Sequence, residues 1–152
     1  MDIELNWQNE LPLKYNPKDD AYSLDLNAIS EVPGIYIFGR RHGKLFEALY
    51  VGKASILRRR IKTQLNNHTL LSHVWNAKAG KRVVLIGEFK AKQHQTYEAC
   101  LPISEKALIR YFVSKGHDLV NVEGVTRTHH GVSSTGTHKA KDFPNHIQVE
   151  VA

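Results

Sequence analysis

The side chains of this sequence that are best suited to chemistry are two tyrosines, two cations and a carboxylate: Tyr36, Tyr50, Lys53, Arg60 and Glu105. Hydrolysis of a phosphodiester needs a positioned water, an acceptor for its proton, and positive charge on the phosphoryl oxygens. This set can supply each part. Glu105 is expected to hold one divalent ion, Mg²⁺ or Mn²⁺, because a hard cation prefers carboxylate and water oxygens.

The tyrosines are candidates to orient or deprotonate the attacking water. A free phenol has a pKa of about 10 and is a poor base at neutral pH, but a nearby cation such as Lys53 or Arg60 favours the phenolate. Arg60 can also hold a phosphate with its planar fork of donors. Taken singly, each of these residues has a plain structural interpretation that is favoured for the tyrosines and for Glu105. Each tyrosine would be a packing aromatic of a strand, Lys53 a surface lysine, and Glu105 a partner of a helix dipole.

The tyrosines are predicted to lie on a β-hairpin. A strand is expected over 32–38, a polar turn over 40–44, and a returning strand over 48–52. Neighbouring strands bring cross-strand side chains together, so the rings of Tyr36 and Tyr50 are expected to share one face.

The next segment has the pattern of a short amphipathic helix. Ser55 can cap it, and apolar residues recur at four-residue intervals within 57–65. With these apolar residues on the buried face of the helix, Arg59 points to solvent. Arg58 and Arg60 lie at the edges of that face, where the aliphatic part of either side chain can pack on apolar neighbours while its guanidinium reaches over a site.

Further elements follow along the chain. A helix over 70–79 ended by Gly80 and a strand over 83–89 are expected. Ser104 is the predicted cap of a last helix, which places Glu105 in the first turn and on the inward line, where the helix dipole favours a carboxylate.

Both ends of the chain look like additions to this centre. Apolar residues alternate within 3–7 and within 147–151, so each terminus is expected to add a strand, and the two strands could pair with each other. The segment 124–141 reads as a mobile or substrate-ordered loop. Its histidines match no metal-ligand spacing. Three of its cations are candidates for phosphate contacts: Arg127, Lys139 and Lys141.

Composition limits the class of partner. The 152 residues carry 21 Lys and Arg against 15 Asp and Glu, a formal charge of +6, which fits nucleic acid or a basic surface without a partner. The single Cys100 excludes an internal disulfide and a cysteine zinc finger. We expect a soluble cytoplasmic protein with no membrane partner, since no leader and no long apolar run is present.

The first predicted strand carries the tripeptide Gly-Ile-Tyr at 34–36, and the second carries Tyr-Val-Gly at 50–52. Arg60, Glu105 and a late Asn121 follow along the chain. These motifs, in this order, resemble the catalytic core of the GIY-YIG nucleases. Each tripeptide alone is weak evidence, but the ordered set is specific. The resemblance implies that Glu105 binds the metal and that Asn121 braces the site.

The segment 50–61 is especially similar to the nuclease domain of the bacterial excision-repair incision enzyme, and this similarity selects Arg60 over Arg58. Two departures from the family are visible. The long stretch before Glu105 leaves Glu98 as a second candidate ligand. Gln64 stands where some members carry a histidine base.

The predicted elements and the resemblance imply an α/β (α+β) fold: a small, mainly antiparallel three-stranded sheet flanked by helices, with extra terminal strands. The expected organisation is an N-terminal extension (1–31), a nuclease core (32–122) and a basic C-terminal extension (123–152). The expected function is a metal-dependent DNA endonuclease, stand-alone or restriction-type. A structure-specific DNA repair nuclease and a noncatalytic nucleic-acid binding module stay open. A homodimer is one route to cutting both strands of a duplex, since one site per chain is implied.

Overall fold

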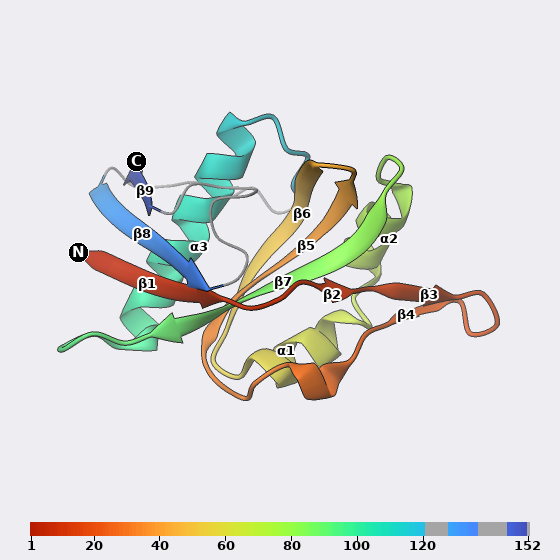
Figure 1. Ribbon diagram of the computed structural model, residues 1–152, viewed down its shortest axis with the longest axis horizontal. Helices are drawn as coiled ribbons and strands as arrows, with labels where there is room; N and C mark the ends of the chain where they lie inside the picture. Colours follow the sequence, from red (N-terminus) through yellow and green to blue (C-terminus); the bar gives the residue numbers. More distant parts are fainter. Residues whose placement is uncertain (121–127, 137–145, 152) are drawn as a thin grey trace.

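A mixed sheet with helices on both sides is the frame of the molecule in the computed structural model, which describes residues 1–120, 128–136 and 146–151 (Figure 1). The strands are β1 (Asp2–Trp7), β2 (Leu11–Pro12), β3 (Lys14–Asn16), β4 (Ala21–Ser23), β5 (Gly34–His42), β6 (Leu45–Ala54), β7 (Lys81–Lys90), β8 (Thr128–Gly136) and β9 (His146–Val151). The helices are the short 3₁₀ helix η1 (Leu26–Ala28), α1 (Leu57–Gln64), α2 (His68–Asn76) and α3 (Tyr97–Ser114).

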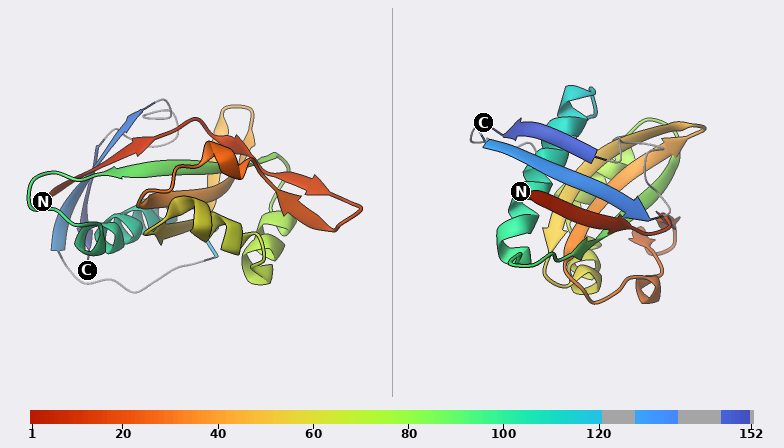
Figure 2. Two further views of the ribbon diagram at one scale, coloured as in Figure 1. Left: turned by 90° about the horizontal axis from the view of Figure 1, so that it is seen from below. Right: turned by 60° about the vertical axis from the view of Figure 1, so that its left-hand side comes forward.

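The main sheet of the described residues has seven strands, in the order β6-β5-β7-β1-β8-β9, with β2 also pairing with β7. All of these pairings are antiparallel except that of β1 with β8. The mixed α/β class and the mainly antiparallel character are therefore confirmed. The prediction of a small three-stranded sheet is wrong, because the terminal strands continue the same sheet and curl it around α3 (Figure 2).

The terminal strands form as their alternation predicts, but they do not pair with each other. Ile3, Leu5 and Trp7 of β1 are almost fully buried, and β8 lies between β1 and β9. The prediction of a loop over 124–141 is wrong for 128–136, which is β8. This polar segment forms a strand because its backbone pairs with β1 on one side and β9 on the other.

Strand β5 separates two apolar cores because its successive side chains point to opposite faces. Ile35 and Ile37 pack with α3 in one core. Tyr36 and Phe38 pack with α1 and α2 in the other. Figure 1 shows α3 on one side of β5 and β6 and the two shorter helices on the other side. Any residue of α3 therefore approaches the hairpin from the face opposite to α1.

The β5–β6 hairpin is longer than expected, and its turn is tighter than the predicted 40–44 segment. The strands run to His42 and from Leu45, and Gly43 supplies the turn with a φ of 61°. A β-bulge after Phe38 shifts the register, so that Phe38 pairs with Tyr50 and Gly39 with Ala48.

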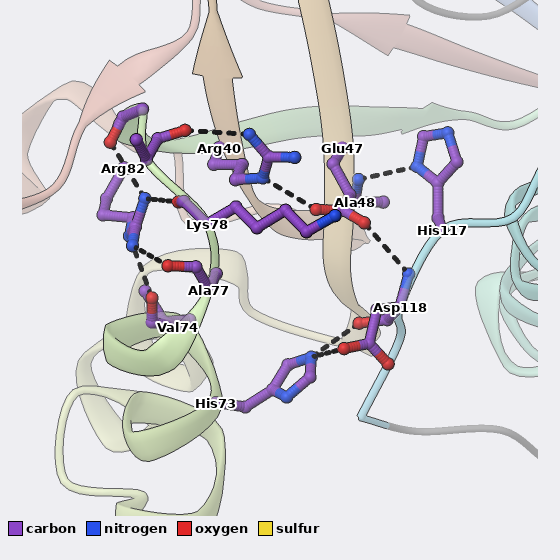
Figure 3. Close-up of polar contacts among 12 residues, drawn as sticks. Arg40, Glu47, Ala48, His73, Val74, Ala77, Lys78, Arg82, His117 and Asp118 are labelled. Carbon is purple, nitrogen blue, oxygen red and sulfur yellow. Dashed lines mark hydrogen bonds and ion pairs between the residues drawn. The ribbon is translucent and has the colours of Figure 1, made fainter.

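Helices α1 and α2 begin and end differently from the prediction. The N-cap of α1 is Ile56 without a side-chain hydrogen bond, so Ser55 is not its cap. Helix α2 begins at His68, after the cap Asn67, and ends at Asn76 rather than at 79. It ends there because the Arg82 guanidinium donates to the carbonyls that follow, including those of Ala77 and Lys78 at 2.9 Å each (Figure 3).

Helix α3 starts earlier than the sequence suggested. Its cap is Thr96, whose side chain accepts from the backbone N–H of Ala99. Ser104 lies inside the helix, where its Oγ donates to the carbonyl of Cys100 at 3.0 Å, and Pro102 is tolerated one turn before Glu105. Glu105 is thus about two turns from the helix start, and a favourable interaction with the helix dipole is excluded as the reason for its position.

The connection after α3 is fastened to the edge strand β6. The Ala48 N–H donates to Nδ1 of His117 at 2.8 Å, and the Asp118 N–H donates to Glu47 at 3.3 Å (Figure 3). The Val120 N–H then donates to the carbonyl of Leu49 at 2.9 Å. These bonds cover part of the open edge of the sheet beside Tyr50. In the described part of the chain, no helix has the length and apolar character needed to cross a membrane.

Candidate active site

The tyrosine pair lies on the face of the hairpin that α1 covers. Tyr36 pairs with Gly52 and Phe38 with Tyr50, so the two tyrosines are diagonal neighbours across β5 and β6. Their rings are stacked, with centroids 6.0 Å apart and an interplanar angle of 23°. The predicted shared face is confirmed.

Gln64 joins the two hydroxyls, a role that the sequence did not reveal. Its side chain is buried, and Nε2 donates to Oη of Tyr36 at 2.7 Å and to Oη of Tyr50 at 3.2 Å. Its Oε1 accepts from Asn67 at 2.8 Å, which fixes the amide orientation. The available signal was its position three residues after the buried Ile61, on the inward face of α1.

Arg60 completes this group from the solvent side. Its guanidinium interacts with the hydroxyls of Tyr36 and Tyr50, and these contacts raise the pKa of Arg60. Burial raises the pKa of Tyr36 above its ordinary value, and the hydrogen bond from Gln64 and the nearby Arg60 only partly oppose that effect. Tyr36 is therefore a neutral phenol at neutral pH. Arg60 acts in the direction expected of a cation beside a phenol, but burial has the larger effect on the pKa of Tyr36.

Gly52 makes room for the Tyr36 ring. A Cβ built on Gly52 would overlap Cζ and Oη of Tyr36, so only glycine fits under the ring. We expect Gly52→Ala to lower the free energy of unfolding by about 1–3 kcal/mol, the usual cost of overpacking. It should also displace the Tyr36 hydroxyl from Gln64. Urea denaturation gives the first quantity and near-UV circular dichroism reports the second. Ser55→Ala, on an exposed residue of the same segment, is the control, and equal stability of the two variants would contradict the packing account.

The carboxylate of Glu105 faces the other side of the hairpin. It is buried on α3, and its Oε1 lies 3.0 Å from Nζ of Lys53, the residue next to Gly52 on β6. The Glu105 side chain is 9% exposed and that of Lys53 is 45% exposed. The predicted inward direction of Glu105 is confirmed, although the predicted helix start is wrong. Because the Lys53 side chain is half-exposed, it can move away from the Glu105 carboxylate without disturbing the core.

Two open depressions meet at the end of β6. One, of about 300 Å³, is lined by Lys53, Arg60 and Thr63 among others. The other, of about 240 Å³, is lined by Lys53, Glu98 and Leu101 among others. Lys53 belongs to both, so it stands between the depression that Arg60 lines and the depression that Glu98 lines. The structure brings the tyrosines, Gln64 and Arg60 into one group and Lys53 and Glu105 into a second, adjacent one.

Arg58 and Arg59 do not join the tyrosines. Arg58 donates through Nε to the carbonyl of Ile29 at 2.8 Å and forms an ion pair with Glu31 at 3.2 Å. It therefore anchors the segment before β5 to α1. Arg59 is exposed, as predicted. The four remaining candidates lie outside the described residues: Asn121, Arg127, Lys139 and Lys141.

No three His, Cys, Asp or Glu side chains gather into a metal-binding group within residues 1–120 or the described parts of β8 and β9. Within this described part of the chain, Glu105 would be the one carboxylate ligand. Such a site suits a hard cation that keeps several waters and takes a substrate phosphate as a further ligand. Among the described side chains, Lys53 is the polar partner of this carboxylate.

Comparison with known proteins gave no match: no family model, no curated protein and no solved structure is similar to this chain. The candidate site therefore depends on the arrangement of its side chains and on the motif resemblance.

Proposed function

We propose that this protein is a metal-dependent DNA endonuclease with a GIY-YIG active site, of a stand-alone or restriction type that acts in the cytoplasm. The observation that carries the proposal is the arrangement at the end of β6. A tyrosine pair tied by Gln64 and flanked by Arg60 lies on one side, and a buried carboxylate paired with Lys53 lies on the other. A phosphate at the exposed end of β6, in the depression that Lys53 and Arg60 line, meets two cations.

Arg60 and Lys53 are the groups that bind the scissile phosphate in this proposal. Both are exposed and line one depression, so they can reach a phosphate held outside the protein surface. The guanidinium fork of Arg60 can hold two phosphoryl oxygens, and the nearby tyrosine hydroxyls raise its pKa. When a phosphate replaces Glu105 as the partner of Lys53, the carboxylate becomes free for a cation.

Mg²⁺ or Mn²⁺, when bound, would neutralise phosphoryl charge and lower the pKa of a bound water. Glu105 is the residue proposed to hold the ion. Its burial and its freedom from other polar partners in the described chain suit this role, and Glu98, which is exposed, stays the weaker candidate.

Tyr50 is the better candidate to contact the attacking water. Tyr36 is 0% exposed, whereas Tyr50 is half-buried at the outer edge of the sheet. Tyr36 would then act as a positioning residue that holds Gln64 and, through it, the Tyr50 hydroxyl.

We expect Tyr50→Phe to slow cleavage by about a hundredfold, which is typical for loss of a group that assists proton transfer. Tyr36→Phe keeps the ring and loses one hydrogen bond, so its effect should stay below about tenfold. Single-turnover cleavage of labelled duplex DNA measures both rates. A larger loss for Tyr36→Phe would exchange the two roles.

A noncatalytic nucleic-acid binding module is the second candidate, and the Lys53–Glu105 ion pair favours it. The pair neutralises the carboxylate in the free protein, which leaves the surface at the end of β6 dominated by Arg59 and Arg60. Such a surface binds phosphates without metal.

A substrate panel tests the proposed function and separates the nuclease subclasses. The purified protein is incubated with a linear duplex, a branched duplex and an RNA hairpin, each end-labelled, in Mg²⁺, Mn²⁺ or EDTA. Metal-dependent cutting of linear DNA at fixed sequences supports the restriction-type nuclease, and cutting at branch points alone supports the structure-specific repair nuclease. Binding of all three substrates without any cutting would replace the nuclease by the binding module.

A further inference from the structure

Three aromatic rings meet where the β3–β4 hairpin lies beside α2. Tyr15 and Tyr22 are a cross-strand pair, with ring centroids 5.5 Å apart. The Trp75 ring of α2 lies 4.5 Å from that of Tyr15 and 6.4 Å from that of Tyr22. Figures 1 and 2 show this hairpin projecting from the main sheet, with α2 close to its base. The rings hold the projecting hairpin against the helix.

Trp75 is far more exposed than this packing role needs. It is 55% exposed, whereas the residues that fix α2 to the core, Leu70 and Val74, are buried. An exposed tryptophan that is already braced by two tyrosines is a rigid aromatic surface. Rings of this kind serve as stacking platforms for nucleobases.

The rings border a hollow of about 490 Å³ between the hairpin and α2. This volume lies in the about 300–1,000 Å³ range of small-ligand sites. Its walls include apolar Leu65 and Leu71, and its rim carries both hydrogen-bond donors and acceptors: Asp20, Asn66, His68 and Ser72. Nucleobase edges also present donors and acceptors beside a flat apolar face.

The hollow adjoins the candidate active site along the chain. Asn66 and His68 of its rim flank Asn67, whose amide donates to Gln64, and Gln64 donates to both tyrosine hydroxyls. The hydrogen bonds from Asn67 to Gln64 and from Gln64 to the tyrosines therefore connect the rim of the hollow with the tyrosine pair. The formal charge of +6 favours a nucleic acid over an anion-poor partner.

We propose that the hollow bordered by Tyr15, Tyr22 and Trp75 is a binding site for one unpaired nucleobase of the DNA substrate, stacked on Trp75. The proposal rests on the proposed function, because it takes the strand held at the tyrosine pair as the source of the base. It makes the protein prefer DNA that has an unpaired base near the cut phosphate over perfectly paired DNA, which fits a stand-alone or structure-specific nuclease rather than a restriction type.

Trp75 itself reports on this site. The other tryptophan, Trp7, is 1% exposed in the core, so quenching by added DNA reports mainly on Trp75. The titration uses a labelled 20-base-pair duplex and the same duplex with one unpaired thymine, both in EDTA so that no metal-dependent cutting occurs. We expect the unpaired thymine to quench the emission and to tighten binding by anisotropy, and the paired duplex to bind without quenching. Binding of the thymine-containing duplex without quenching would overturn the proposal.

Variants give a second, independent test. Trp75→Ala should weaken binding of the duplex with the unpaired thymine by about 5- to 150-fold, the usual range for loss of one stacked base. Binding of the paired duplex should change less than twofold. Trp75→Phe keeps a ring and should lose less. Val113→Ala, on an exposed apolar residue of α3, is the control and should change neither affinity. An equal loss of affinity for both duplexes with Trp75→Ala would overturn the proposal, as would a larger loss with Val113→Ala.

The outcome is separate from that of the nuclease proposal, because the titration needs no cleavage. Quenching of Trp75 emission in a protein that cuts no DNA would support the proposed base site and contradict the proposed nuclease. Metal-dependent cutting by a protein whose Trp75 emission is not quenched would support the nuclease and contradict the base site.

Discussion

Glu105→Gln is expected to slow DNA cleavage by about a thousandfold or more. A metal ion at a phosphoryl centre contributes several kcal/mol to the transition state, and about 4 kcal/mol corresponds to a thousandfold. Glutamine keeps the shape of the side chain on α3 but lacks the charge that holds a divalent cation. The measurement is single-turnover cleavage of duplex DNA in Mg²⁺, with the variant checked for an unchanged unfolding transition.

The same substitution should leave DNA affinity equal or higher. It removes a negative charge near the proposed phosphate position and releases Lys53 from its ion pair. Glu98→Gln is the matched control, because Glu98 is an exposed carboxylate two turns earlier on α3 that lines the same end of β6. Parallel loss of binding and cleavage in Glu105→Gln would contradict the ligand role, and a greater loss of cleavage in Glu98→Gln would move that role to Glu98.

Arg60→Ala carries the second large effect, a loss of about 100- to 1,000-fold in cleavage together with weaker DNA binding. This is the usual cost of removing one fixed donor to a developing charge. The guanidinium lies beside both tyrosine hydroxyls, which raise its pKa, so its removal also takes a positive charge from the tyrosine pair. Cleavage rates measure the catalytic loss, and binding isotherms at two salt concentrations measure the loss of DNA affinity.

Arg59→Ala is the matched control for Arg60. Arg59 is the preceding residue on α1 and is exposed, but it shows no interaction with the tyrosines. Its removal should reduce only the salt-sensitive part of the affinity. Arg60→Lys should recover part of the binding and little of the rate, because an ammonium lacks the planar fork. A greater loss of cleavage with Arg59→Ala would reverse the assignment of the two arginines.

Local patterns were sufficient to predict the hairpin and its tyrosines. The period of two in a strand decides which side chains share a face, and this placed Tyr36 and Tyr50 together without knowledge of the register. The helical period of about 3.6 residues in the same way predicted that Arg59 is exposed and that Glu105 points inward. Gln64 was missed because its role depends on two partners from another element, and a buried amide has no distinctive local pattern.

The wrong predictions concern features of the fold that contacts between distant parts of the chain determine. Ser104 was predicted as a helix cap, but the helix begins at Tyr97, after the cap Thr96, and continues through Pro102 because α3 packs its inward face on the sheet. The terminal strands were predicted singly. Their joining into one seven-stranded sheet depends on pairings between residues more than a hundred positions apart, such as Ile3 with Val132.

The most direct test of the central claim is the conversion of supercoiled plasmid DNA by the purified wild-type protein in Mg²⁺ and, in parallel, in EDTA. The proposed active site predicts nicked or linear products in Mg²⁺ and intact plasmid in EDTA. Plasmid that is bound by the protein, as seen by retarded migration, yet stays supercoiled in Mg²⁺ and Mn²⁺ would contradict the nuclease.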